Sequence, residues 1–297
     1  SMHSTTMPQT CYLVAMARLL AMSNATTLRS KLRLPAWTGG VIGIVSTLAI
    51  WWLLAETVFA SVGTRPDGSG GAIPTPIEVV LQLIEDGFGF YWRNGIITLT
   101  EAAIGFAWGN ALALVFAGIA LVLPRLETLT TQIAVITYCI PIVAIGPIVR
   151  LVVGAPGAGE PAGAAIVLAA LSVFFTTMIG ALTGVKATDK RMLDVVTAYG
   201  GGAIQRLLRV QLLSALPSIF AAFKIAAPAA FLGAILGEYV GGPDVGFGPA
   251  MVNAQQSLEI ARVWGVALIS GLIAGGGYAL FSIIGKLVTP WAKVTNR

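Results

Sequence analysis

Residues 194–219 read DVVTAYGGGAIQRLLRVQLLSALPSI, a short amphipathic segment inside an otherwise very apolar chain. Three consecutive glycines at 200–202 form a flexible joint ahead of it. On a helical wheel one broad face is apolar and the other carries Gln205, Arg206 and Arg209. The apolar face holds Ile204, Leu207, Leu208, Val210 and Leu212. The pattern predicts a short helix at 203–212 that closes before Pro217.

The composition around this segment is that of an integral membrane protein. Of the 297 residues, 56% are hydrophobic and 10% are charged, whereas soluble domains carry about a quarter charged residues. The mean hydropathy of +0.85 points the same way. The net charge of +5 does not indicate a nucleic-acid partner, because the basic residues fall at membrane boundaries. We therefore expect an all-α polytopic protein in a lipid bilayer.

Six apolar runs are long enough to cross a bilayer, which takes about 20 residues each. They are 39–60, 96–123, 128–153, 161–185, 217–240 and 263–287. A seventh run, 10–22, is short and contains Arg18, so we interpret it as an interfacial or disordered segment. We expect residues 1–38 to form an N-terminal segment and 39–297 the transmembrane domain, with a loop at 186–216.

The basic residues predict how the chain lies in the membrane. With the N-terminus inside, thirteen Lys and Arg residues fall on the cytoplasmic side and four on the outer side, and Lys224 lies near the inner end of the fifth span. Both termini are therefore expected in the cytoplasm. The outer segment 74–93 has apolar residues at helical spacing and predicts a short amphipathic helix on the outer surface.

The loop resembles the "EAA loop" of ABC-transporter permeases, the binding-protein-dependent inner-membrane components. The family pattern is Glu-Ala-Ala, three residues, Gly, nine residues, Ile, one residue, Leu-Pro. Here Asp194 takes the glutamate position and Gly200 the glycine, while Val210 and Leu212 fit the Ile and Leu positions. Val195 and Val196 replace the alanines, Leu213 replaces the first proline, and Pro217 matches a common second proline.

Three further segments are similar to the nitrate/sulfonate/taurine branch of that family. They are IPTPIEVV at 73–80, CIPIVAIGPIV at 139–149 and GEYVGGPDVGFGPAMVNAQQ at 237–256. The resemblance implies a permease in the cytoplasmic membrane of a prokaryote that works with ATPase subunits, a second permease subunit and an extracytoplasmic binding protein. It also implies a coupling helix that docks on the ATPase through Asp194, Gly200, Ala203, Arg206, Leu207, Arg209 and Pro217. The second permease is either an identical copy or a homologue.

The chain has no G-x-x-x-x-G-K-[ST] phosphate-binding loop, so its energy must come from another chain or from an ion gradient. We expect no catalysis, cofactor or metal on this chain, with ATP and Mg²⁺ bound by the partner ATPase. One alternative is a self-contained carrier driven by H⁺ or Na⁺, which requires inverted repeats and paired carboxylates at mid-membrane. For 203–212, the alternative to ATPase docking is a basic helix lying on anionic lipid.

Five residues within the spans are candidates for a pathway or gate: Glu101, Tyr138, Pro141, Pro147 and Glu238. Intramembrane carboxylates are costly and often functional, but each can also serve as acceptor for a hydroxyl or backbone group of a neighbouring helix. The prolines break the third span, which predicts either a simple kink or backbone that lines a cavity. The pairs Gly105/Gly109 and Gly271/Gly275 predict close helix contacts.

Overall fold

The computed structural model describes residues 36–63 and 71–293, and within these ranges every regular element is a helix. Contacts divide the chain into two units, Ser1–Val62 and Gly63–Arg297, which are described separately. The predicted interfacial run 10–22 lies outside the described residues. The expected all-α membrane fold is confirmed for the part that the structure describes.

The first unit contains one described helix, α2 (Ala36–Glu56). It is long and apolar enough to cross a membrane, and most of its side chains are exposed within the unit. Near its end the Trp52 indole N–H donates to a Glu56 carboxylate oxygen over 2.8 Å. The helix ends at Glu56, slightly earlier than the predicted boundary at residue 60.

The second unit opens with α3 (Pro76–Val122), which the sequence divides at Gly87. Thr75 and Glu78 form a reciprocal capping box, and Pro76 occupies the first turn, where its missing N–H costs nothing. Gly87 has φ 72° and ψ 163°, a conformation that only glycine adopts without strain. The expected outer helix therefore ends at Asp86 instead of residue 93, and the long apolar helix begins directly after the break.

The third predicted span is two helices, α4 (Glu127–Cys139) and α5 (Ile142–Val153), joined at an angle of 97°. A single 3₁₀ turn, η1 (Pro124–Leu126), precedes them. Pro141 lies at the bend in extended conformation and has no N–H to continue the α4 hydrogen bonds. The predicted proline break is confirmed.

The remaining helices follow with short connections. They are α6 (Gly163–Lys186), α7 (Lys190–Ala198), α8 (Ala203–Arg206), the π-helical η2 (Leu207–Gln211), α9 (Leu212–Gly241), α10 (Phe247–Gln256), α11 (Ile260–Val288) and the 3₁₀ turn η3 (Pro290–Lys293).

One boundary among them was predicted wrongly. We expected a short helix at 203–212 that closes before Pro217, with Pro217 starting the fifth span. Residues 203–241 instead form one continuous helix, and Pro217 lies inside it. A proline removes one helical hydrogen bond, but an apolar setting offers the backbone no water to replace the others. The helix therefore continues through it.

Helix α6 is the centre of the unit, and glycines let α3 and α9 approach it closely. A Cβ atom on Gly105 or Gly109 of α3 would lie 2.4 Å from α6 atoms, and one on Gly237 of α9 would lie 2.3 Å from Ala165. The predicted contacts of Gly105 and Gly109 are thus confirmed. Gly271 and Gly275 have no atom within 4 Å of such a Cβ, so the second predicted pair makes no helix contact among the described residues.

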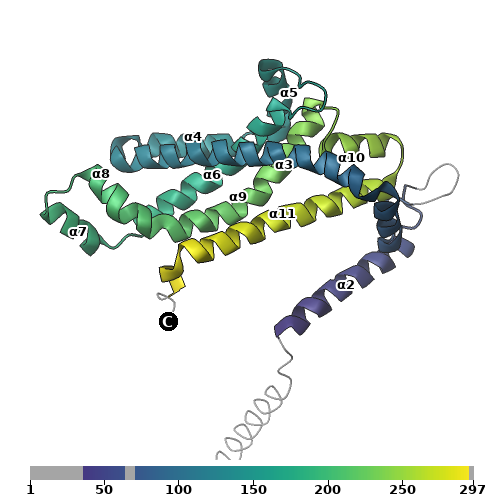
Figure 1. Cartoon of the computed structure of the whole chain (residues 1–297), viewed down its shortest axis with the longest axis horizontal. Helices are drawn as coiled ribbons and strands as arrows, with labels where there is room; N and C mark the ends of the chain where they lie inside the picture. The colour runs from purple at the N-terminus through teal and green to yellow at the C-terminus, as the bar shows by residue number, and fades with distance from the viewer. Residues whose placement is uncertain (1–35, 64–70, 294–297) are drawn as a thin grey trace, which may run out of the picture. The chain divides into compact units, whose positions relative to one another are not determined.

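Contacts along α6 fix the direction of each helix (Figure 1). Glu101 bonds Ala162 at one end and Glu127 pairs with Lys186 at the other, so α3 and α6 run in the same direction. The bent α4–α5 pair connects the end of α3 to the start of α6, so it must run back along the full length of the unit. Helix α9 runs back along α6, and α11 runs forward again beside α9, where Gly285 faces Phe220.

Five successive segments therefore run from one end of the second unit to the other: α3, the α4–α5 pair, α6, α9 and α11. We call the end that carries residues 242–259 the cleft end and the end that carries residues 187–202 the loop end. Five described helices are long and apolar enough to cross a membrane, and counting the bent pair as one span brings the number to six. Six spans with both termini in the cytoplasm remain a prediction.

Candidate functional site

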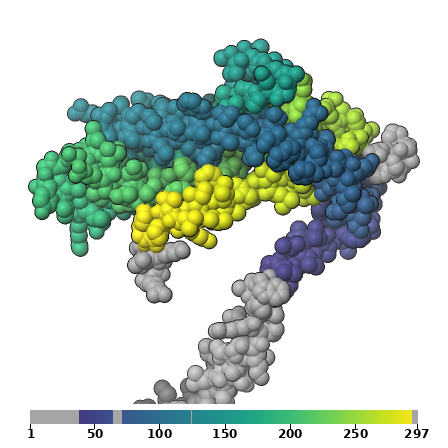
Figure 2. Space-filling view, viewed as in Figure 1, coloured from purple at the N-terminus to yellow at the C-terminus, as the bar shows by residue number. Residues whose placement is uncertain are grey.

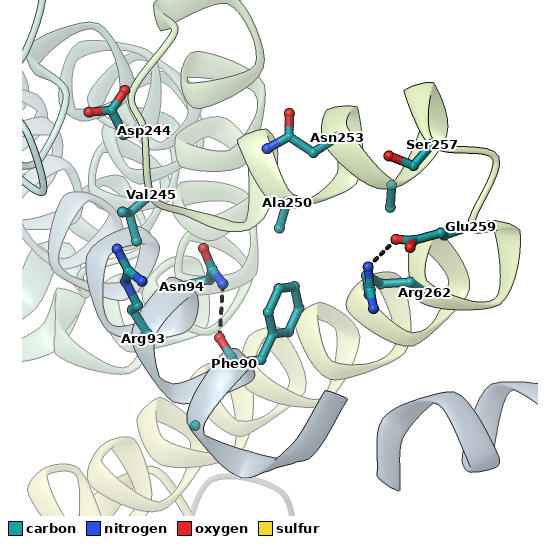
Figure 3. A pocket seen from close by; sticks show the side chains of 12 residues that line it. Phe90, Arg93, Asn94, Asp244, Val245, Ala250, Asn253, Ser257, Glu259 and Arg262 are labelled. Carbon is teal, nitrogen blue, oxygen red and sulfur yellow. Dashed lines mark hydrogen bonds and ion pairs between the residues drawn. The ribbon is translucent and has the colours of Figure 1, made fainter. Parts of the chain in front are cut away.

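A polar cleft of about 560 Å³ opens at the cleft end between α3, α10 and the start of α11 (Figure 3). Four polar side chains in its wall make no hydrogen bond or ion pair to any described residue: Arg93, Asp244, Asn253 and Ser257. They supply a cation, an anion, an amide and a hydroxyl to the same space. The cleft therefore offers unpartnered groups of both charges to whatever enters it.

The far wall of the cleft is held by an ion-pair cluster centred on Asp86. This carboxylate is 1% exposed and accepts from Arg262 at 2.7 and 2.8 Å and from the Tyr91 hydroxyl at 2.9 Å. Arg262 also pairs with Glu259 and stacks 5.6 Å above the centre of the Phe90 ring. Because Asp86 immediately precedes the Gly87 break, the cluster fixes the first segment of α3 against α11.

Behind the cleft, three successive backbone N–H groups at the start of α10 each have a side-chain acceptor. Gly246 donates to Asn94 over 3.1 Å, Phe247 to Thr98 over 2.9 Å and Gly248 to Glu238 over 2.6 Å. The first N–H groups of a helix have no partner within it. These side chains from α3 and α9 therefore both satisfy and position the start of α10.

Glu101 and Glu238 lie together beneath this network and are fully buried, at 0% and 1% exposure. Glu101 Oε1 accepts from Ala162 N at 2.5 Å, and Glu238 Oε1 accepts from the Thr98 hydroxyl at 2.6 Å. The expectation that each serves as acceptor for a neighbouring helix is confirmed. Glu101 Oε2 is buried without a hydrogen-bond donor among the described residues and lies beside Glu238.

At the loop end, α7 and the start of the long helix project from the unit, and none of the residues of α7 or α8 is buried (Figure 2). Gly200 turns the chain between them with φ 79°, and the Gly201 N–H closes the turn on the Val196 carbonyl over 2.8 Å. Several apolar side chains here are exposed, among them Val195, Tyr199, Ile204 and Leu208; Tyr199 is 90% exposed. The joint predicted at 200–202 is therefore a defined left-handed turn.

The predicted coupling residues all lie in this region but differ in exposure. Asp194, Gly200, Ala203 and Arg209 are exposed, whereas Arg206, Leu207 and Pro217 are half-buried. The five-residue π-helical turn that contains Leu207 shifts the register of the apolar face. For this reason Leu208 lies more open than Leu207, which the regular wheel did not anticipate.

The broken third span brings its candidate residues together only in part. Tyr138 stacks on Phe175 of α6, with ring centroids 4.6 Å apart. The Thr137 hydroxyl is satisfied by the Ile133 carbonyl of its own helix at 2.8 Å. Pro147 lines a shallow cavity of about 610 Å³ together with Arg150 and Val240, whereas Pro141 lies exposed at the bend.

Comparison with known proteins shows to which family this architecture belongs. A family model described as "Binding-protein-dependent transport system inner membrane component" matches residues 109–294, well over half of the chain. The chain belongs to this family. The match includes the bent pair, the loop end and the cleft-end segment from Glu238 to Arg262, so the permease family accounts for most of the second unit.

Named relatives agree with this placement. The chain is 27% identical to a probable ABC transporter permease of Haemophilus influenzae over 77% of this chain and 86% of that protein. It is 25% identical to the putative aliphatic sulfonates transport permease SsuC of Bacillus subtilis over 94% and 93%, and 24% identical to the formylaminopyrimidine transport permease ThiX of Halalkalibacterium halodurans over 82% and 94%. The resemblance to an ABC permease of the sulfonate-type branch is confirmed.

A solved structure shares the fold. An inward-facing MetNI methionine ABC transporter chain aligns with a TM-score of 0.52 at 18% identity, covering 67% of this permease and 94% of that chain. At this identity the likeness describes the fold alone. The family match and the apolar helices together make the protein a multi-pass membrane subunit of an ABC transporter.

Sequence reasoning missed the residues that build the cleft and the network behind it. Asn94 and Thr98 stand four residues apart on α3, a spacing that places both on one helix face. The T-P-I-E sequence at 75–78 is a recognisable capping box. Neither signal reveals that the partners of Asn94 and Thr98 lie about 150 positions later in the chain.

Proposed function

We propose that the chain is the membrane-spanning permease subunit of an ATP-driven ABC importer for a small polar or anionic solute. It acts in the cytoplasmic membrane of a prokaryote with ATPase subunits, a second permease subunit and an extracytoplasmic binding protein. ATP and Mg²⁺ belong to the ATPase. The observation that carries the proposal is the loop end, where a chain of this family presents a left-handed turn and exposed apolar side chains outside its packed helices.

The loop end has the properties of a protein-docking surface. Its apolar side chains are exposed beside cationic Arg206 and Arg209, and α7 buries none of its residues within the chain. Exposed apolar clusters with polar rims mark interaction sites. We assign the contact with the ATPase to the 194–217 segment, with α7 and the residues after Gly200 as its two arms.

The cleft end suits the extracytoplasmic partner. It lies at the opposite end of five crossings from the loop, so a protein docked there is on the other side of the membrane from the ATPase. The unpartnered Arg93 and Asp244 give this surface charges of both signs. Charged groups of this kind guide encounter and register more than they add affinity. We assign the binding-protein contact to this surface.

One observation bears on the alternative of an ion-driven carrier. Glu101 and Glu238 form the paired buried carboxylates that such a carrier requires. However, Glu238 lies one turn from the helix end at Gly241, and the bonds of both residues hold backbone and hydroxyl groups in place. This arrangement fits a structural clamp better than a mid-membrane ion site.

Reconstitution separates the two functions. In proteoliposomes that contain the ATPase and the binding protein, we expect uptake that continues after the proton gradient is collapsed. Uptake that stops with an uncoupler while ATP remains would favour the carrier.

A single substitution tests the docking surface. Leu207→Glu places a charge in the proposed contact, a penalty of several kcal/mol when buried, and should abolish recovery of the ATPase in a pull-down. Arg206→Gln with Arg209→Gln is the comparison for a helix that only lies on lipid. Undiminished ATPase recovery and normal transport with Leu207→Glu would overturn the coupling role.

A further inference from the structure

Lys224 is an intramembrane cation that the fold leaves without a partner. It lies on α9 about 26 Å along the axis from the helix end at Gly241, within the roughly 30 Å of a bilayer core. It is half-buried and makes no hydrogen bond or ion pair to any described residue. The other charged side chain of α9, Glu238, lies about 21 Å away and is bound at the cleft end. No described group neutralises Lys224.

The backbone at the same level is also unsatisfied. Pro228 lies four residues after Lys224 inside α9, and a proline has no N–H to donate to the carbonyl four residues earlier. The Lys224 carbonyl oxygen therefore lacks its helical donor. A cationic donor and a free acceptor belong to one residue, deep in the helix.

The surface of α9 at this level is open. Helix α6 covers the side of Ala222 and Ala226, and α11 covers the side of Phe220 and Ala227. Between them runs a strip of α9 that no described helix covers at this level. It contains Ala221, Ile225, Pro228 and Leu232, with Lys224 at its border. An ammonium group facing hydrocarbon is costly, so this strip requires water or an anion in front of it.

We infer that Lys224 and its free carbonyl form a binding station for the anionic group of the solute, partway across the membrane. The inference rests on the proposed import function and makes the solute class anionic. A lysine ammonium is a compact charge with three donors, which suits a sulfonate, carboxylate or other oxyanion. The carbonyl accepts from a donor elsewhere on the same solute, such as an amino group. The strip around them lines the path.

Thiol labelling tests this without knowledge of the solute. In a full-length chain with Cys11 and Cys139 changed to Ser, Ala221→Cys places a thiol one turn from Lys224 on the same strip. Ala279→Cys is the matched control, an exposed alanine on the side of α11 turned away from α9. The probes are the anionic sulfonatoethyl and the cationic trimethylammonioethyl methanethiosulfonates, applied to membrane fragments open on both sides.

The expected result has two parts. Ala221→Cys should react with both water-borne probes, whereas Ala279→Cys should react with neither. The ratio of anionic to cationic rates at Ala221→Cys should fall about tenfold when Lys224→Gln is added, as expected for a unit charge at short range in a partly screened path. Lys224→Arg should retain the ratio.

Two outcomes would overturn the inference. If Ala221→Cys is as unreactive as Ala279→Cys, the strip faces lipid and Lys224 extends to the headgroups. If the ratio of anionic to cationic labelling rates is the same with Lys224→Gln, the charge of Lys224 does not act on ions at Ala221. Failure of the import function would appear separately, as lost ATPase recovery by the otherwise unchanged chain, because the labelling rates do not depend on ATPase binding.

Discussion

The two ends of the 39-residue helix Ala203–Gly241 are built on opposite plans. At the cleft end, Gly237 and Glu238 are buried, and Glu238 bonds α3 and α10 at once. At the loop end the helix begins exposed at Ala203, passes through a π turn and packs little until Ala215. One end is completed within the chain, whereas the other presents surface for a partner.

The difference indicates that the cleft end contributes mainly to the stability of the fold and the loop end mainly to assembly with a partner. Changes at the cleft end should act on folding, because they break contacts that the chain makes with itself. Changes at the loop end should leave the chain folded and act on assembly. The predictions below test this division, from the largest expected effect to the smallest.

Gly237→Leu should have the largest effect. Even a Cβ atom here would lie 2.3 Å from the backbone of Ala165, which cannot move aside. Overpacking of this kind costs several kcal/mol, so we expect most of the protein to be lost from the detergent-soluble, monodisperse fraction. Gly275→Leu is the matched control, because a Cβ there meets no atom within 4 Å. Equal yields of the two variants would contradict the close packing.

Glu238→Ala should come second. It leaves the Gly248 N–H buried without its acceptor, a loss of about 1–3 kcal/mol. It also removes the shorter bond of the Thr98 hydroxyl, which keeps only the Asn94 carbonyl oxygen at 3.3 Å. We expect a melting temperature several degrees lower in detergent and faster proteolysis at 242–259. Glu238→Gln, which keeps one acceptor, should lose less. The exposed Glu85→Ala is the control and should melt as wild type does; a similar loss there would remove the argument for the clamp.

Gly200→Val should have a smaller effect on stability but a clear one on assembly. With φ 79°, a β-branched residue costs roughly 1–3 kcal/mol of local strain, although no contact is lost. The melting temperature should fall by less than in Glu238→Ala, which loses two buried bonds, while ATPase recovery in a pull-down falls clearly. Gly202→Val serves as control because its φ of −76° suits any residue. If both variants recover the ATPase equally, the geometry of the turn does not matter for docking.

Lys186→Gln should have the smallest effect. It removes the exposed ion pair with Glu127 at the loop end, and exposed pairs contribute about 0–1 kcal/mol. The shift in melting temperature should be barely measurable and should vanish in high salt. A shift comparable to that of Glu238→Ala would mean that the loop end carries fold stability after all.

Much of the fold could be predicted because a bilayer permits few structures. The length of apolar runs indicates the spans, and the four-residue spacing of Gly105 and Gly109 indicates a close contact. Pro217 misled the prediction because proline tolerance depends on the surroundings of the helix. The π turn at Leu207–Gln211 could not be predicted, since one extra residue in a turn leaves no compositional trace.

The candidate site was less accessible from sequence. Glu101 and Glu238 were singled out by the cost of burying a carboxylate, and the structure shows what they bond. Their mutual contact, and the pairing of Asn94 and Thr98 with residues 246–247, depend on how α3 and α9 pack on α6. Long-range pairing of this kind is decided by tertiary packing, which single-residue patterns do not encode.

The parallel course of α3 and α6 has a consequence of simple parity. If each of the five crossings of the second unit spans the bilayer, an odd number of traverses separates Pro76 from Val288, and we expect reporters fused near these two positions to read opposite compartments. Adding α2 as one more traverse makes the number even, and tags ahead of α2 and after η3 would then read the same compartment. A pair of alkaline phosphatase and green fluorescent protein fusions can therefore count crossings modulo two without locating a single helix boundary.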